Sequence, residues 1–444
     1  MHTTTANTDP STPNFAALIG LDWGDKSHAI ALACADGQRE QLSLEHSAEA
    51  LHRWLQQLQQ RFGAGPVALA FEHHTGPLLH VLVQYPWLTI YPIAPVTSAL
   101  YRQTWKPSGA SDDGPDALAI LDLLEHHRDK LRPLVLDELL TRKLAGLVEA
   151  RRSGVDTRSS VTNQLRSVLK SYFPQALELA GKNLASPMAL DFLTKWPDLI
   201  SLKAARPATI QSFFYRHNLR RPERLKERLE VIAQAMALTT DEAIISVATA
   251  QVALLVEQLR VLQKHIAKFD DAIKKAFVQH PDASLFGQLP GAGPAMAPRL
   301  VVAFGDDRGR YPSATSFQQY AGVAPVREKS GKREWIHWRW NAPVFLRQTL
   351  VEWAGQTVIW CPWAADFYRA MEKRGKNRQT ILRALAFKWV RILWRCWQER
   401  TPYDEAKYLA AMKKRNSPYA LSIPKPAKTR TAQNTENAAQ PEKQ

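Results

Sequence analysis

One stretch of the sequence, residues 245–273, spaces its apolar residues in a way that strongly favours a long helix. They recur alternately three and four positions apart: Ile245, Ala248, Val252, Leu255, Leu259, Leu262, Ile266, Phe269 and Ile273. A repeat that averages 3.5 residues places all of them on one side of an α-helix. We predict a long helix here and favour a coiled coil between two chains. The alternative is a helix that packs within the bundle of its own chain.

The N-terminal part of the chain has short apolar runs separated by turn residues, the pattern of strands. We expect strands over 16–24, 27–37 and 39–47, a helix over 47–62, then a strand, a helix, a strand and a helix over 66–76, 77–85, 88–93 and 116–127. Ala35-Asp36-Gly37 reads as a hairpin turn, and Ser47 as a helix cap. This order predicts a mixed α/β layer of the ribonuclease-H-like type.

The remainder of the sequence is predicted to be mainly helical. We divide the chain into a tail at 1–14, an α/β domain at 15–136, a helical and coiled-coil region at 137–280, a C-terminal domain at 281–416 and a basic tail at 417–444. Both tails are expected to be disordered. Residues 290–294, PGAGP, resemble the turn of a helix-hairpin-helix, where Gly291 and Gly293 would let backbone N–H groups approach a phosphate. A simple connection between two helices is the alternative.

The charge of the chain points to a polyanionic partner. It has 58 Lys and Arg against 42 Asp and Glu, a net charge of +16. Residues 1–136 carry 9 basic and 14 acidic residues, whereas residues 328–444 carry 23 basic and 10 acidic ones. Nucleic acid is the first candidate for such a balance and an anionic membrane the second. The acidic front is expected to bind cations, and the basic back phosphates.

The cysteines and the N-terminus bear on the cellular compartment. Cys34, Cys361 and Cys396 are odd in number and far apart, which argues against a disulfide framework or a zinc site. The first residues do not resemble a signal peptide, and we find no apolar run near the roughly 20 residues that a membrane span needs. We therefore expect a cytoplasmic protein that does not contact membranes.

Four acidic residues form a candidate metal site. Asp22 and Glu72 each follow an apolar strand, and Asp113 and Asp116 lie three apart at the start of a helix. Strand ends gather ligands in α/β sheets, and oxygen ligands suit Mg²⁺ or Mn²⁺. Two such ions can hold the attacking and leaving oxygens of a phosphodiester. A single Asp after a strand is more often a turn or cap residue, and Asp25 or Asp112 could replace a member of the quartet.

Two other groups of residues are weaker candidates. His73 and His74 beside Glu72 could be ligands or a proton shuttle, although ordinary strand-end residues are the more common case. Residues 329–340 mix basic and aromatic side chains. Their aromatic residues, Trp335, His337, Trp338 and Trp340, suit stacking on bases, or else form a buried strand face. The basic helices near 373–395 are further candidates for nucleic-acid contact, with Trp389, Trp394 and Trp397 in the core.

Several motifs, in order, resemble the DEDD transposases of bacterial insertion sequences. They are LIGLDWGDKSH, FEHHTG, SDDGPDALAI, LPGAGPAMAPRLVVAFGD, FQQYAGVAPVREKSGK and FLRQTL, spread over roughly residues 17–400. Members of this family are related to the Piv DNA invertase, and some are guided by a bridge RNA. The sequence departs from the family at Ser111-Asp112, where Lys-Thr is usual, and after Ser330-Gly331, where glycines are usual.

The resemblance implies a reaction and its residues. It implies a RuvC-like domain, a coiled-coil insertion and a C-terminal transposase domain. It also implies that Asp22, Glu72, Asp113 and Asp116 bind Mg²⁺ and that Ser330 is the nucleophile that links covalently to DNA. Dimers or tetramers, and in some members a guide RNA, are the implied partners.

Basic residues close to Ser330 suit the stabilisation of charge on the phosphoryl oxygens. These residues are Lys329, Lys332 and Arg333, with Arg339 further along. Two other functions stay open at this point. One is a RuvC-like junction endonuclease that uses water as its nucleophile. The other is a non-catalytic DNA-binding protein, which would leave the acidic quartet without a purpose.

Overall fold

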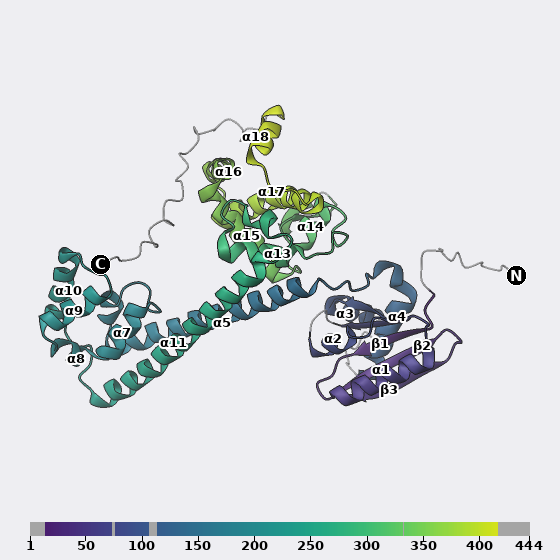
Figure 1. Cartoon of the computed structure of the whole chain (residues 1–444), viewed down its shortest axis with the longest axis horizontal. Coiled ribbons are helices and arrows are strands. Elements are labelled where there is room, and N and C mark those ends of the chain that lie inside the picture. The colour runs from purple at the N-terminus through teal and green to yellow at the C-terminus, as the bar shows by residue number, and fades with distance from the viewer. Residues whose placement is uncertain (1–13, 73–75, 106–112, 332, 416–444) are drawn as a thin grey trace, which may run out of the picture. The chain divides into compact units, whose positions relative to one another are not determined.

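A computed structural model describes residues 14–72, 76–105, 113–331 and 333–415 (Figure 1). The chain forms two compact units, residues 1–136 and 137–444, and each is described by itself. The two predicted disordered tails lie almost wholly outside the described residues, as do His73, His74, Asp112 and Lys332.

The first unit is built on a five-stranded sheet. Its strands are β1 (Ala17–Asp22), β2 (Ser27–Cys34), β3 (Arg39–Glu45), β4 (Val67–Glu72) and β5 (Leu88–Ile93), in the order β3-β2-β1-β4-β5. The first three strands are antiparallel, while β4 runs parallel to β1 and β5 parallel to β4. The predicted mixed α/β architecture is confirmed, and the strand order is compatible with a RuvC-like domain.

Local sequence signals account for the first elements. Gly37 has a φ of 91°, and its N–H donates to the carbonyl of Cys34 at 3.0 Å, which closes the β2–β3 hairpin. The Ser47 hydroxyl accepts the N–H of Ala50 at 3.2 Å and caps α1 (Ala48–Phe62). Both features were predicted from the sequence and are confirmed.

Helices cover both faces of the sheet. On one face, α1 and α2 (Pro77–Leu82) contribute to a core with alternate residues of the strands. On the other face, α4 (Asp113–His127) packs over β1, β2 and β4, and a short 3₁₀ turn (Arg128–Lys130) follows it. One helix was predicted after β5, but there are two, because α3 (Pro95–Trp105) precedes α4. The Ser and Thr residues of α3 weaken its helical signal.

The second unit is mainly helical and has two hydrophobic cores. One core contains the C-terminal half of α5 (Leu139–Tyr172), the N-terminal half of α11 (Glu242–Val278) and residues of the short helices between them. These helices are α6 (Ala176–Leu179), α7 (Pro187–Lys195), α8 (Leu199–Lys203), α9 (Pro207–Arg216) and α10 (Pro222–Gln234). The mainly helical character predicted for residues 137–280 is confirmed in this core.

The other core gathers the opposite ends of α5 and α11 with the C-terminal helices. These are α12 (Ala283–Gly287), α13 (Gly293–Phe304), α14 (Ala314–Tyr320), α15 (Val344–Trp360), α16 (Pro362–Lys373), α17 (Arg378–Glu399) and α18 (Glu405–Lys414). Trp389 and Trp397 are fully buried in it, as predicted, and Trp394 packs against it and donates to the carbonyl of Tyr311 at 2.9 Å.

The helix predicted from the heptad pattern exists, but its apolar seam packs within its own chain. Helices α5 and α11 lie side by side and antiparallel (Figure 1). Arg151 pairs with Asp270, and a Cβ on Gly154 would lie 3.3 Å from Ile266. Leu259 has no exposed surface. The favoured prediction of a seam between two chains is therefore wrong, since partners inside the chain already bury six of its nine residues.

Helix α11 also has the length and mean hydropathy of a membrane span, which the sequence prediction did not anticipate. This composition does not by itself indicate a membrane span, because core helices of soluble proteins share it. Here the buried face of α11 belongs to the two cores just described.

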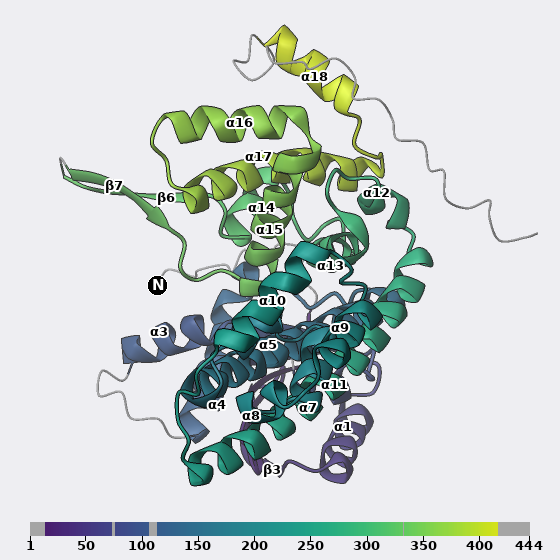
Figure 2. The same ribbon diagram turned by 90° about the vertical axis from the view of Figure 1, so that its left-hand side faces the viewer.

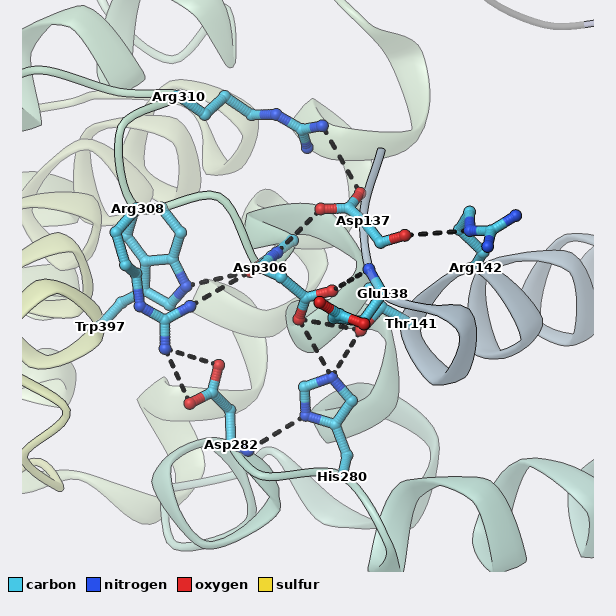
Figure 3. Close-up of polar contacts among 11 residues, drawn as sticks. Asp137, Glu138, Thr141, Arg142, His280, Asp282, Asp306, Arg308, Arg310 and Trp397 are labelled. Atoms are coloured by element: carbon cyan, nitrogen blue, oxygen red, sulfur yellow. Dashed lines mark hydrogen bonds and ion pairs between the residues drawn. The ribbon is translucent and has the colours of Figure 1, made fainter. Parts of the chain in front are cut away.

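A buried polar network joins α5, α11 and the loop that follows α13 (Figure 3). The N–H of Asp282 donates to Nδ1 of His280 at 3.0 Å, so the ring proton lies on Nε2. Nε2 is 2.7 Å from the Thr141 hydroxyl, which donates to Asp306 at 2.9 Å. Arg308 holds both oxygens of Asp282 at 2.8 and 2.7 Å.

The same network fixes the first residues of the second unit. The Asp306 carboxylate accepts the N–H of Glu138 at 2.7 Å, while the N–H of Asp306 donates to Asp137 at 2.8 Å. The Arg310 guanidinium lies 3.5 Å from the same Asp137 carboxylate (Figure 3). The chain is therefore anchored by side-chain hydrogen bonds where it enters this unit.

Candidate active site

Asp22 and Glu72 lie side by side at one edge of the sheet. Strands β1 and β4 are parallel, and their register pairs Leu21 with Phe71. Asp22 and Glu72 are the next residue on each strand, and both side chains are half-buried. The sequence predicted two acids at strand ends, and the parallel register makes those two ends neighbours.

Helix α4 brings Asp116 to the sheet. Asp116 is only 8% exposed and lies next to Ala117. A Cβ built on Gly20 of β1 would lie 2.3 Å from the Ala117 carbonyl oxygen, so only glycine permits this close approach of α4 to β1. Asp113 is the first residue of α4, and its side chain is outside the description. The described part of the quartet thus comes from β1, β4 and α4.

An arginine lies between two members of the quartet. The Arg102 guanidinium of α3 contacts the Asp116 carboxylate, and its Nη2 atom is 3.7 Å from Oε1 of Glu72. The Ser98 hydroxyl of the same helix donates to Oε1 of Glu72. Neither residue was predicted from the sequence, because both lie in α3, a helix that the sequence pattern did not indicate. Arg102 shows that these carboxylates accept a cation between them.

A histidine pair supports the turn after Asp22. The N–H of Gly24 donates to Nδ1 of His28 at 3.3 Å, and Nε2 of His28 lies 2.9 Å from Nδ1 of His46. The Trp23 ring packs against both imidazoles. Burial, with a smaller effect of His46, lowers the pKa of His28 to about 4, so this imidazole is neutral at pH 7.

A second acidic group was not predicted from the sequence. Asp122, Glu125 and His126 of α4 place one ligand atom each within 4.8 Å of one another. However, Tyr101 donates to Asp122, and Arg39 pairs with Glu125 at 2.8 Å. These partly exposed side chains therefore already have partners in the protein.

Ser330 lies at the tip of a projecting β-hairpin. Strands β6 (Pro325–Ser330) and β7 (Arg333–Trp338) pair so that Ser330 faces Arg333 across the turn (Figure 2). Gly331 has a φ of 59°, which a tight turn between two strands requires. Lys329 and Ser330 are exposed. The serine therefore lies where a large substrate can reach it.

The aromatic residues of this hairpin are largely open to solvent. Trp335 is 46% exposed, and Trp340, just beyond β7, is 78% exposed. This exposure excludes the alternative of a fully buried strand face. Nε2 of His337 lies 2.7 Å from Glu328, whose carboxylate raises the pKa of His337. Arg333 and Arg339 are exposed as well.

The predicted glycine turn connects α12 and α13. Gly291 has a φ of 69°, and a Cβ there would lie 2.9 Å from Cβ of Gln356 in α15. Gly293 has a φ of 49°, is exposed, and has open space around it. Gly291 therefore has a packing role in this turn, while Gly293 leaves the start of α13 accessible.

Comparisons with known proteins agree with these features. A family model described as Transposase matches residues 19–174, and one described as Transposase IS116/IS110/IS902 family matches residues 283–369. The chain belongs to this transposase family. The transposase is 27% identical to the IS117 mini-circle protein of Streptomyces coelicolor over 90% of its own length and 98% of that protein.

Two other relatives extend the comparison. The uncharacterized IS116 insertion-element protein of Streptomyces clavuligerus is 25% identical, over 89% of this chain and 98% of its own length. The pilin gene-inverting protein of Moraxella bovis is 28% identical over 28% of this chain and 39% of its own length. Members of this family are DNA-cutting and DNA-rejoining enzymes, so the protein is an enzyme that acts on DNA.

Proposed function

We propose that this insertion-sequence transposase cuts and rejoins DNA through a covalent bond between Ser330 and the DNA, with the acidic quartet holding Mg²⁺. The observation that carries the proposal is the position of Ser330 at the exposed tip of a hairpin, beside Lys329 and opposite Arg333. A serine held in this way can reach a phosphodiester in a duplex, whereas a buried serine could not.

The residues that would hold the metal are Asp22, Glu72, Asp113 and Asp116. The Arg102 guanidinium beside Glu72 and Asp116 supports this assignment, because it fits a positive charge between the same oxygens. Carboxylate oxygens are the ligands that Mg²⁺ and Mn²⁺ prefer. When bound, the ion would neutralise negative charge on the scissile phosphate. A RuvC-like fold for residues 15–136 is part of this proposal.

The chemical step belongs to the serine. The Ser330 hydroxyl oxygen forms a bond to the phosphorus, the sugar oxygen of the cut strand leaves and takes up a proton, and the serine proton passes to solvent. A hydroxyl from another DNA end later attacks the same phosphorus and loses its proton to solvent, while the Ser330 oxygen leaves and takes up a proton. One phosphodiester is broken and one is formed, so the exchange requires no external energy source.

Nucleic-acid contacts would surround the serine. Lys329, Lys332, Arg333 and Arg339 suit phosphates, as do the backbone N–H groups near Gly293 and Gly291. Trp335 and Trp340 are exposed enough to stack on bases. Assembly as a dimer or tetramer and the use of a guide RNA are also included in the proposal. So are the domain division given above and a bacterial cytoplasmic location.

A covalent adduct tests the serine directly. Ser330→Ala should abolish a protein–DNA adduct that survives denaturing electrophoresis, while Ser246→Ala, an exposed serine of α11, should leave it intact. Strand cleavage that persists without an adduct in Ser330→Ala would contradict the proposal and favour a junction endonuclease that uses water.

The metal assignment has its own test. Asp22→Asn should abolish recombination and weaken Mn²⁺ binding measured by calorimetry, yet leave duplex binding largely unchanged. Asp25→Asn is the matched control, because Asp25 is exposed three residues further along and should retain activity. Normal recombination by Asp22→Asn would refute the metal site. Loss of recombination in Asp25→Asn alone would mean that Asp25, and not Asp22, is the metal ligand.

A further inference from the structure

The base of the Ser330 hairpin rests on an unusual arginine. The Arg383 guanidinium of α17 lies against the ring of Trp338, the last residue of β7. Such a contact fixes the hairpin to the helical body. However, Nη1 of Arg383 is buried and has no hydrogen-bond partner among the described residues. A charged donor left in this state costs free energy unless an acceptor joins it.

A second positive charge, that of Arg347, acts on the Arg383 guanidinium. Burial and the charge of Arg347 in α15 together lower the pKa of Arg383 to about 10. Nη1 of Arg347 donates to the carbonyl of Arg339 at 3.3 Å. Across the described ranges of the chain, neither Arg347 nor Arg383 forms an ion pair with a carboxylate, although twelve of the other arginines do.

We propose that Arg347 and Arg383 form a seat for one phosphate of the DNA strand that Ser330 attacks. A phosphate between two guanidinium groups accepts their N–H donors in pairs and removes the repulsion between them. Exposed basic residues in and beside the α16–α17 loop favour a long polyanion over a small free ion: Lys373, Arg374, Lys376 and Arg378. This inference rests on the proposed function, because Ser330 defines the strand.

The hairpin sets the position of this phosphate relative to the cut. The Pro325–Trp338 pair at the base and the Ser330–Arg333 pair at the tip are five residues apart along β6. At about 3.3 Å per residue this separation is roughly 17 Å. One DNA strand advances about 3.4 Å per nucleotide. The seat should therefore hold a phosphate about five nucleotides from the scissile one when the duplex lies along the hairpin.

Duplex binding tests the seat without requiring the chemical step. The full chain carrying Ser330→Ala serves as the parent, and a fluorescein-labelled duplex containing an element end is titrated at several salt concentrations. Adding Arg347→Gln and Arg383→Gln should weaken binding roughly tenfold and reduce the salt slope by about 0.9, the value for one lost phosphate contact. Lys226→Gln removes an exposed charge of α10, outside the candidate contact regions, and should leave the slope unchanged.

Arg347→Gln alone distinguishes loss of the phosphate contact from displacement of the hairpin, since it leaves the contact between Arg383 and Trp338 in place. This variant should also reduce the slope. A neutral methylphosphonate placed five nucleotides from the cut should weaken duplex binding by the parent protein. It should leave duplex binding by the double variant unchanged. Unchanged affinity and slope in both arginine variants would overturn the seat. A loss seen only with RNA would overturn the assignment to DNA. Neither result depends on whether Ser330 forms an adduct.

Discussion

Gly20→Ala should separate the acidic residues from one another without changing any of them. A Cβ at this position of β1 would lie 2.3 Å from the Ala117 carbonyl oxygen and 2.4 Å from the Leu121 nitrogen, although Cβ atoms essentially never approach closer than 3.0 Å. Helix α4 must therefore move away by at least about 0.7 Å, which is the shortfall in that contact. Both contacts are with backbone, so no side chain can rotate aside. Overpacking of this kind costs about 1–3 kcal/mol.

The same displacement moves Asp116, which precedes Ala117 on α4. Because metal ligands tolerate shifts of only about 0.2 Å, Mn²⁺ binding should weaken, and strand cleavage should fall by roughly a hundredfold. Hydrogen–deuterium exchange of β1 and α4 peptides would report the loss of local stability, and calorimetry the metal affinity. Gly146→Ala is the control, since a Cβ there meets nothing within 4 Å. Native exchange rates and normal cleavage in Gly20→Ala would refute the reasoning.

Three further predictions concern charged or titratable groups. Because the fold lowers the pKa of His28 from 6.5 to about 4, its contribution to stability is complete above pH 6.5 and is lost as the pH falls. The free energy of unfolding should fall by about 2 kcal/mol between pH 7 and 5. In His28→Gln, the urea midpoint of unfolding should change less over the same pH range. Asp282→Ala leaves Arg308 buried without its carboxylate and should lower the free energy of unfolding by about 3–5 kcal/mol. Adding Arg308→Met should restore part of this stability. An Asp282→Ala variant as stable as the unmodified protein would contradict the role of the pair. Arg102→Gln should lower the thermal stability of the metal-free protein and tighten Mn²⁺ binding; weaker binding would mean that Arg102 assists the ion.

Much of the architecture could be read from local patterns. Short apolar runs separated by turn residues predicted all five strands of the sheet, and the 3.5-residue repeat predicted α11. Short-range signals such as Gly37 and Ser47 act within a few residues of the chain, so their effect does not depend on distant packing. Asp22 and Glu72 could be identified as strand-end acids for the same reason.

The partners of these elements could not be read in this way. The heptad seam of α11 fits a second chain as well as α5, and the tertiary structure chose α5 because that helix lies antiparallel beside it. No local sequence pattern indicates the role of Arg102. That role depends on its contacts with Glu72 and Asp116, which are 30 and 14 residues away in sequence.

By itself, the sequence determined the order of the strands along the chain, the acidic residues available to bind a cation and the family to which the chain belongs. Only the tertiary structure decided which carboxylates meet, that an arginine lies between two of them, and that Ser330 stands at a hairpin tip whose base rests on Arg383. The physical reason is that periodicity and capping are properties of neighbouring residues. Charge pairing and close packing instead join residues that the chain brings together only when it folds.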